Sequence, residues 1–279
     1  MAVRTLLFSI ALVAACGSEP AAPPAPAAPA EAKPEHAADL KLDAAQLQAQ
    51  PKTDALVPSP AEMQATLTKA GLTSQLGTMV ADRDVVTKVE NLDQTAVRVG
   101  VVLADLVLTI KDAPKDRVIN QLGRLKEGFV ALGAGADTAA TLDDLINRVK
   151  TEAVTRDDLI KEMDELSGVM VPELKFEGKE WMVPLIQAGS WLEGAHLVSG
   201  AIKAEGKAET AAHLLQQPAV VDHFLKYVQH EGRNKAPDAV VDKLQETLLT
   251  LKEVTGKPTL TAADIDTIHS ATGAVLTLL

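Results

Sequence analysis

The sequence predicts an all-α fold, a single bundle-like domain of about nine or ten helices. Apolar residues recur at helical spacing through most of the chain from residue 59 onward, and helix start and end signals divide it into segments. Strand signals are nearly absent, and no Asn-Gly or Asp-Gly hairpin turn occurs. Nothing resembling a linker interrupts residues 59–279, and about 220 residues can bury one sizeable core, so we expect a single domain there.

Capping patterns mark the starts of several helices. Ser59-Pro-Ala-Glu62 has the form of a capping box with proline at the first helical position, and Gly71 follows as an end signal. The same logic predicts starts at Thr155 with Asp158, at Thr261 with Asp264, and at Thr141 with Asp143 and Asp144. The predicted helices are 60–70, 83–91, 93–112, 115–132, 141–152, 156–170, 179–204, 207–216, 219–231, 237–255 and 262–278, of which one or two are expected to merge or melt.

Two of these segments, residues 95–110 and 184–202, are apolar around most of their circumference, as buried helices are. Each carries a glycine followed by an acid: Gly100 with Asp105 in the first, and Gly189 with Glu193 in the second. Charge or proline interrupts both segments, so we expect core helices and not membrane spans.

Composition narrows the possible partners. The formal net charge is −11, which argues against binding to nucleic acid or adsorption to anionic lipid headgroups. Aromatic residues make up only 3% of the chain, too few for a base-stacking surface. The chain holds a single cysteine, so the domain must be stable without disulfides.

That cysteine, Cys16, follows a basic start at Arg4 and an apolar run over residues 6–15. The segment Val13-Ala14-Ala15-Cys16 resembles the lipobox of bacterial lipoproteins. The resemblance implies a signal peptide at 1–15 and a Cys16 that carries lipid chains such as palmitate. The alternatives are an ordinary secretory signal cut after Ala15 and an accidental apolar start of a cytoplasmic protein. The run is too short for a retained transmembrane anchor, which needs roughly 20 residues.

A proline- and alanine-rich stretch follows the cysteine. Prolines at 20, 23, 24, 26, 29 and 34 favour an extended polyproline conformation, and we expect residues 16–58 to form a flexible tether. Gly17 stands where many lipoproteins kept at the inner membrane carry aspartate. We therefore expect a protein anchored in the bacterial cell envelope, at the outer membrane and facing the periplasm.

The central segments resemble a family. Gly189-Ser-Trp191-Leu-Glu193-Gly, with Gly100-Val-Val-Leu-Ala-Asp105-Leu upstream, is similar to sequences in uncharacterised all-helical lipoproteins of bacterial cell envelopes. The likeness covers about residues 93–200 and implies no activity. His196 stands where the family pattern has an aromatic residue.

Two acid–histidine pairs could carry chemistry. Glu193-Gly-Ala-His196 and Asp266-Thr-Ile-His269 have the spacing that places both side chains on one helical face, as in bundles that bind two metal ions. Such pairs also arise easily by chance among 38 acids and 6 histidines. Asp105, with Arg98, Thr109 and Asp112 on its side of the helix, is expected in a polar stripe with an Asp–Arg contact, and not as a buried acid.

Three glycines accompany Glu193 in one helix, at 189, 194 and 200. Glycine costs about 1 kcal/mol in a helix interior, so something is expected to approach closely there. One interpretation is tight helix–helix packing with Glu193 hydrogen-bonded inside. The other is a small-ligand pocket rimmed by Trp191, Glu193 and His196.

The chain from Cys16 onward lacks a nucleophile elbow, a phosphate loop, a zincin pattern and a cysteine nucleophile. The sequence therefore favours a non-catalytic role, structural or binding an envelope protein partner, with no cofactor. A small-ligand carrier that uses the glycine-lined pocket near Glu193 is the first alternative, and a dimetal carboxylate/histidine enzyme is the second.

Overall fold

A computed structural model describes residues 57–73, 76–80, 85–207, 212–234, 238–277 and 279, all within one compact unit, Lys52–Leu279. The predicted signal peptide at 1–15 and the predicted tether up to residue 56 lie outside these residues. Ten α-helices and no strand occur in the described part, which confirms the all-α, multi-helix prediction.

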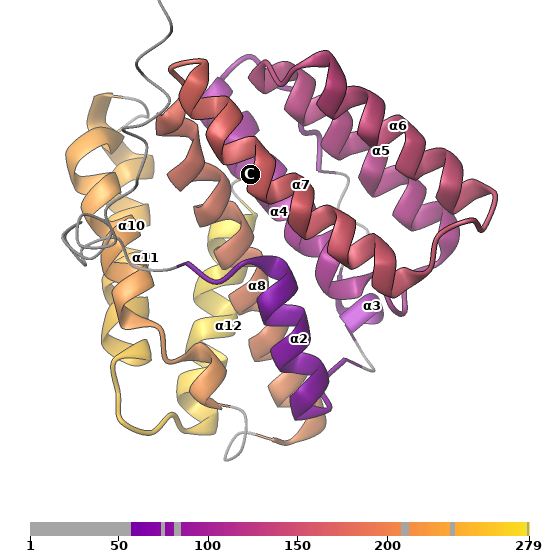
Figure 1. Ribbon diagram of the computed structural model, residues 1–279. Coiled ribbons are helices and arrows are strands. Elements are labelled where there is room, and N and C mark those ends of the chain that lie inside the picture. Colours follow the sequence, from indigo (N-terminus) through magenta and orange to yellow (C-terminus); the bar gives the residue numbers. More distant parts are fainter. Residues whose placement is uncertain (1–56, 74–75, 81–84, 208–211, 235–237, 278) are drawn as a thin grey trace, which may run out of the picture. The chain divides into compact units, whose positions relative to one another are not determined.

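The helices form one bundle-like body (Figure 1). They are α2 (Pro60–Ala70), α3 (Leu76–Met79), α4 (Leu92–Thr109), α5 (Lys115–Leu132), α6 (Ala136–Lys150), α7 (Arg156–Phe176), α8 (Val183–Glu205), α10 (Pro218–Glu231), α11 (Asp238–Thr255) and α12 (Ala262–Leu276). Short 3-10 turns lie at η1 (Glu180–Met182), η2 (Ala212–Leu215) and η3 (Gly232–Asn234). The predicted 207–216 helix corresponds only to η2 among the described residues.

The predicted caps at Ser59, Thr155 and Thr261 form. Ser59 Oγ accepts from the backbone N–H of Glu62, whose carboxylate accepts from the N–H of Ser59 at 2.8 Å. Thr261 and Asp264 make the same reciprocal pair at the start of α12. These contacts satisfy N–H groups that a helix start leaves without partners, which is why the local sequence predicts them.

Two predicted boundaries differ from the structure by five and six residues. The helix predicted from Thr141 begins five residues earlier, at Ala136, with Gly135 as its N-cap. Thr141 instead donates its hydroxyl to the carbonyl of Asp137, 2.9 Å away and one turn earlier in the same helix. A threonine can satisfy its hydroxyl in either way, so a cap pattern inside a longer helix is ambiguous. Helix α7, predicted to end at residue 170, runs on to Phe176.

Residues 85–91, which belong to the predicted helix 83–91, are not helical. Thr87 is 1% exposed and donates its hydroxyl to the carbonyl of Arg124 in α5 at 2.7 Å. The hydroxyl of Thr95 in α4 donates to the carbonyl of Val89 at 3.4 Å. Hydrogen bonds to α5 and α4 therefore hold this segment in a non-helical form, and local sequence does not reveal them.

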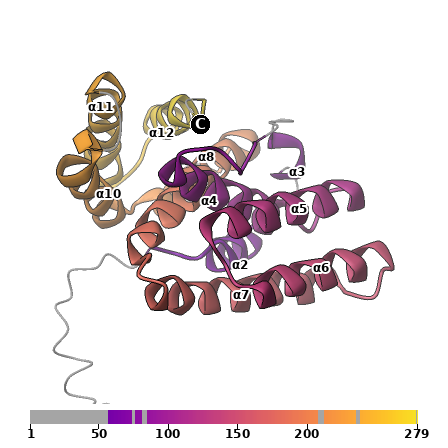
Figure 2. The same ribbon diagram turned by 90° about the horizontal axis from the view of Figure 1, so that it is seen from above.

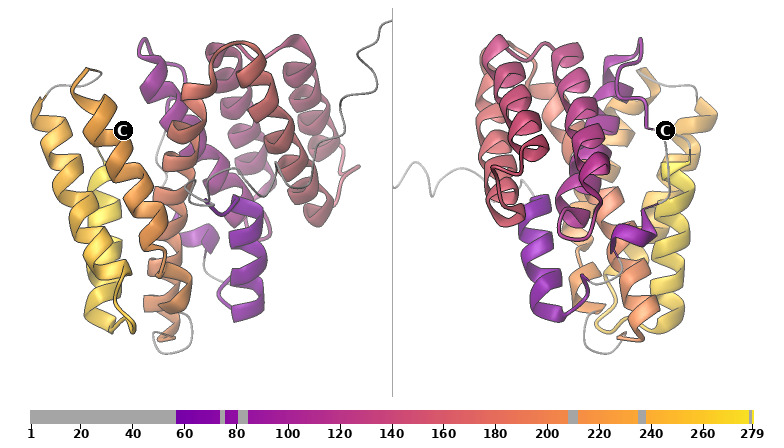
Figure 3. Two further views of the ribbon diagram at one scale, coloured as in Figure 1. Left: turned by 60° about the vertical axis from the view of Figure 1, so that its left-hand side comes forward. Right: turned by 90° about the vertical axis from the view of Figure 1, so that its right-hand side faces the viewer.

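The core has two apolar clusters, and helix α4 contributes to both. Val99, Leu103 and Leu106 of α4 pack in the cluster with α5, α6 and α7, while its Val101 and Leu108 pack in the cluster with α8 and α12. Figures 2 and 3 show the same division, with α10–α12 on one side, α5–α7 on the other, and α4 and α8 between them. Helix α8 makes its most extensive contacts with α4 and α12.

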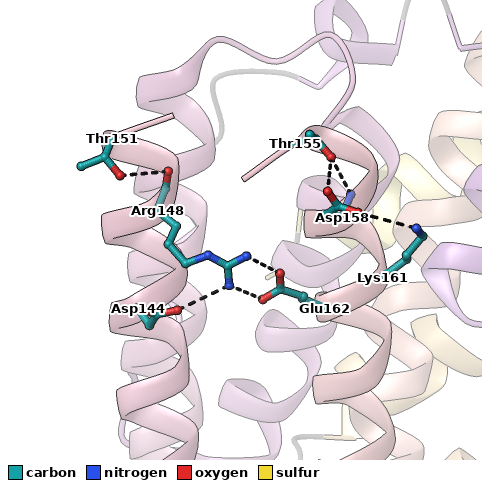
Figure 4. A network of polar contacts seen from close by, with 7 residues as sticks. All are labelled: Asp144, Arg148, Thr151, Thr155, Asp158, Lys161 and Glu162. Carbon is teal, nitrogen blue, oxygen red and sulfur yellow. Dashed lines mark hydrogen bonds and ion pairs between the residues drawn. The ribbon is translucent and has the colours of Figure 1, made fainter. Parts of the chain in front are cut away.

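A bidentate ion pair connects the antiparallel helices α6 and α7 (Figure 4). Arg148 of α6 donates to both carboxylate oxygens of Glu162 in α7, at 2.7 and 2.6 Å. The Glu162 hydrogen bonds raise the pKa of Arg148 above its already high ordinary value. Thr155 caps α7 about two turns before Glu162, and its hydroxyl bond to Asp158 lowers the pKa of that carboxyl.

Among the described residues, a search for membrane-spanning helices found none that combine the necessary length and apolar character.

Candidate functional site around helix α8

Helix α8 carries the three candidate binding residues, and it points Trp191 away from Glu193 and His196. Each residue advances an α-helix by about 100°, so positions two and five residues apart lie on different faces. Trp191 faces α2 and η2, where it lines a cavity. His196 faces α12, and Glu193 is 0% exposed. The structure therefore does not bring the three side chains together around one space.

One face of α8 lies against α4 at backbone distance. A Cβ atom added to Gly100 would lie 2.0 Å from the carbonyl oxygen of Ile186, and one added to Gly189 would lie 2.0 Å from that of Val97. The two helices run in the same general direction, and each supplies the glycine that admits the other. The hydroxyl of Ser190 adds a buried bond to the carbonyl of Gly100 at 2.9 Å.

The other glycines near Glu193 are also covered. A Cβ at Gly194 would lie 2.6 Å from Sδ of Met63 in α2, and one at Gly200 would lie 3.3 Å from Cε1 of His269 in α12. Neighbouring helices thus occupy the space beside these glycines, which favours the packing interpretation over a glycine-lined pocket at Glu193.

Further along α8, two histidines form its contact with α12. The imidazole rings of His196 and His269 stack in parallel, with centroids 4.1 Å apart and an interplanar angle of 7°. Nδ1 of each ring lies 3.1 Å from the backbone carbonyl oxygen of the other histidine. A carbonyl only accepts, so each Nδ1 carries a proton and donates it across the interface.

Each histidine belongs to the same short pattern, His-x-x-Ser/Thr-Gly, at 196–200 and 269–273. The hydroxyls of Ser199 and Thr272 donate to the carbonyl of the histidine in their own helix, at 2.9 and 3.1 Å. Each glycine lies under the opposite ring, and a Cβ at Gly273 would be 3.0 Å from Cε1 of His196. The repeated pattern is a sequence signal of this contact, and the acid–histidine spacing alone did not point to it.

The acids of the two pairs take different roles. Asp266 forms an ion pair with Lys203 of α8 at 2.7 Å, about one turn from the histidine stack, whereas Glu193 is buried inside the bundle. The described residues contain no group of three or more His, Cys, Asp or Glu side chains arranged to hold a metal ion. The two histidines of these pairs meet in the contact between α8 and α12.

Asp105 is buried, at 4% exposure, which corrects the prediction of a polar stripe. The expected partner Arg98 instead donates to the carbonyl of Val86 at 2.9 Å, and Thr109 bonds inside its own helix. Asp105 lines a cavity of about 530 Å³ together with Arg117 and other side chains of α5. The packing of α5 against α4 encloses this face, and a helical wheel cannot show that.

Trp191 is 3% exposed and is held from two sides. Its indole N–H donates to Oε1 of Gln217 at 2.7 Å, and its ring is tilted against Phe224 with centroids 5.9 Å apart. It lines a cavity of about 190 Å³ whose lining includes neither Glu193 nor His196.

Comparisons of the chain with family models, with curated proteins and with solved structures found no match.

Proposed function

We propose that this protein is a lipid-anchored, periplasm-facing lipoprotein of the outer membrane whose helical domain has a non-catalytic role, structural or binding an envelope protein partner. The observation that carries the proposal is the segment Val13-Ala14-Ala15-Cys16 after an apolar run. The proline-rich stretch that follows supports it, because eighteen residues of extended chain could separate domain and membrane by roughly 55 Å.

The physical role of the lipid is durable attachment. One acyl chain holds a protein only marginally, whereas several chains at one site add about 0.8 kcal/mol for each buried CH₂ group. A triacylated Cys16 would keep the domain at the membrane surface. The acidic net charge of −11 would oppose adsorption of the domain itself to anionic lipid, which favours a domain held away from the membrane.

The arrangement of α8 supports a non-catalytic role. Both histidines of the acid–histidine pairs use Nδ1 in the contact between α8 and α12, and Asp266 pairs with Lys203. Side chains engaged in this way stabilise a helix interface. A general acid or base, in contrast, needs to reach a substrate proton at hydrogen-bond distance.

The test of the anchor is Cys16→Ser, with Ser18→Ala as the matched control. We expect the wild type and the control to fractionate with outer membranes and to incorporate a radiolabelled palmitate precursor. Cys16→Ser should lose the label and move to the soluble fraction. Retention of Cys16→Ser in the membrane with an unlabelled chain would contradict the proposal.

The partner-binding form has its own test. Phe176 and Val169 of α7 are the most exposed large apolar side chains among the described residues, at 90% and 61%. Cross-linking in intact cells should give a reproducible adduct with the wild type that Phe176→Ser weakens, with Leu249→Ser on α11 as the control. No adduct at all would favour the structural form.

A further inference from the structure

A groove opens beside the start of α2. It has a volume of about 390 Å³ and is lined by residues of α2, α4, α5, α7 and α8. We propose that it binds a small hydrophobic amine, a molecule with an apolar ring on a short chain that ends in one ammonium group. The proposal stands independently of the lipid anchor.

The sides of the groove present apolar surface to solvent. Val57, Pro58, Val183 and Ile186 line it and are only half-buried, so part of each side chain remains accessible. Other apolar lining residues belong to the core: Leu103, Phe129, Met170 and Leu174. A ring placed in the groove would cover the accessible parts of the half-buried side chains together with its own surface, and the hydrophobic effect favours that burial.

Gly168 keeps the groove open along α7. It lies inside this helix and is exposed, and a Cβ atom added to it would meet none of the described atoms within 4 Å. Glycine weakens a helix interior, and no close contact inside the domain requires it at this position. The lack of a side chain here leaves room for a ligand against the backbone of α7.

Two carboxylates converge at one end of the groove. Glu62 accepts the backbone N–H of Ser59 at 2.8 Å, and Asp164 of α7 accepts the hydroxyl of Ser59 at 3.1 Å. Because both bind the same residue, their negative charges lie near each other, and both acids are exposed. No lysine or arginine is among the described residues that line the groove. This end of the groove therefore attracts a cation.

The charge of the ligand follows from these carboxylates. An anion would be repelled by them and by the net charge of −11. A neutral molecule would bind by its apolar part alone. An amine on a short chain can place its ring among the apolar side chains and its ammonium group beside the two acids.

The volume sets the size of the ligand. A cavity of about 150 Å³ engineered in another protein holds benzene, so 390 Å³ has room for a ring and a chain of a few carbon atoms. Small-molecule sites in proteins typically measure about 300–1,000 Å³ and combine apolar walls with a few polar groups, as this groove does.

The experiment is a titration of the full chain, carrying Cys16→Ser and labelled with nitrogen-15, with 4-phenylbutylamine and with 4-phenylbutan-1-ol. The two probes have the same shape and differ in an ammonium against a hydroxyl group. The backbone N–H signal of Gly168 reports the groove. That of Gly123, a helical glycine of α5 that does not line the groove, is the internal reference.

Both probes should shift the Gly168 signal saturably and leave the Gly123 signal in place. The amine should bind with a Kd about two- to fivefold lower than that of the alcohol, the gain expected from a solvent-exposed ion pair. Added salt should weaken binding of the amine and not of the alcohol.

Charge-neutralising variants locate the ammonium group. Asp164→Asn keeps an oxygen that accepts from Ser59, and Glu62→Gln keeps a capping box at the start of α2. Each should weaken binding of the amine about two- to fivefold and leave the alcohol unchanged. The matched control is Glu165→Gln, an exposed acid of α7 that does not line the groove, which should change neither.

Three results would overturn the proposal: no saturable shift of the Gly168 signal with either probe, an alcohol that binds as tightly as the amine, or folded Asp164→Asn and Glu62→Gln variants that bind the amine as the control does. Should the variants fail to fold, the comparison of amine and alcohol in the Cys16→Ser chain, at low and high salt, decides alone.

Discussion

The contacts of α8 with α4 and with α12 are packed in different ways. Toward α4, Gly100 and Gly189 let the backbones touch, so a single added methyl group would meet a carbonyl oxygen at 2.0 Å. Toward α12, Gly200 and Gly273 also create space, but a histidine ring from the partner helix fills each space. The same residue type thus serves a backbone contact with α4 and a side-chain contact with α12.

This difference predicts different tolerance. A backbone carbonyl cannot turn away without breaking helical hydrogen bonds, whereas an imidazole can shift by a few tenths of an ångström. The contact between α8 and α4 should therefore not tolerate a larger side chain at its glycines, whereas the contact between α8 and α12 should adjust to one.

The largest expected effect is that of Gly189→Ala. The methyl group would force α8 away from α4 along the most extensive helix contact of the domain, and we expect a loss of at least about 3 kcal/mol in the free energy of unfolding. Denaturant unfolding measures it. The control is Gly123→Ala in α5, where an added Cβ meets nothing within 4 Å, and this variant should gain about 0.5–1 kcal/mol. Equal behaviour of the two variants would show that α4 and α8 are not in backbone contact.

Gly273→Ala tests the contact with α12 and should cost less, about 1–2 kcal/mol, because the new methyl group meets only the ring of His196, with Cε1 nearest at 3.0 Å. In a His196→Ala background the same change should be neutral or stabilising, since the obstructing ring is gone. A double-mutant cycle of the two changes, followed by denaturant unfolding, gives the coupling. Absence of coupling would mean that the ring does not lie over Gly273.

The start of α12 adds a pH-dependent contribution. Hydrogen bonds from Lys257 and Thr261 lower the pKa of Asp264 from its ordinary value of 3.8 to about 2. A depressed carboxyl pKa stabilises the folded state above the unfolded value, and that stabilisation is lost as the pH falls from about 4 toward 2. In Asp264→Asn, acid unfolding followed by circular dichroism should show a shallower loss of stability over this window.

Asp222 is held at a pKa of about 2 by Lys226 and Lys252 and contributes over the same range of pH. Asp222→Asn is therefore the positive control for that experiment. If neither variant changes the acid-unfolding curve between pH 4 and 2, these ion pairs do not persist in solution.

The smallest expected effect is that of Lys203→Ala. Its ion pair with Asp266 spans 2.7 Å between α8 and α12, but the two side chains are 43% and 57% exposed. Exposed pairs contribute about 0–1 kcal/mol, so unfolding in low and high salt should differ only slightly from the wild type. A loss comparable to that of Gly189→Ala would show that charge, and not packing, holds α12 in place.

Local chemistry explains how much of the fold the sequence could predict. The caps at Ser59, Thr155 and Thr261 depend on residues three apart, and the sequence alone identified them. The extended segment around Thr87 and the burial of Asp105 depend on α5, which lies far along the chain, and these predictions failed.

By itself the sequence determined that the domain is all-helical, where most of its helices begin and end, and that α8 needs close neighbours. Helix propensity, capping and periodicity act over a few residues, so they can be recognised without a structure. Only the tertiary structure decided which neighbour each face of α8 meets. Trp191 lines a cavity, Glu193 lies in the core and His196 stacks on a second histidine in α12. These surroundings depend on the packing of helices that are distant in sequence.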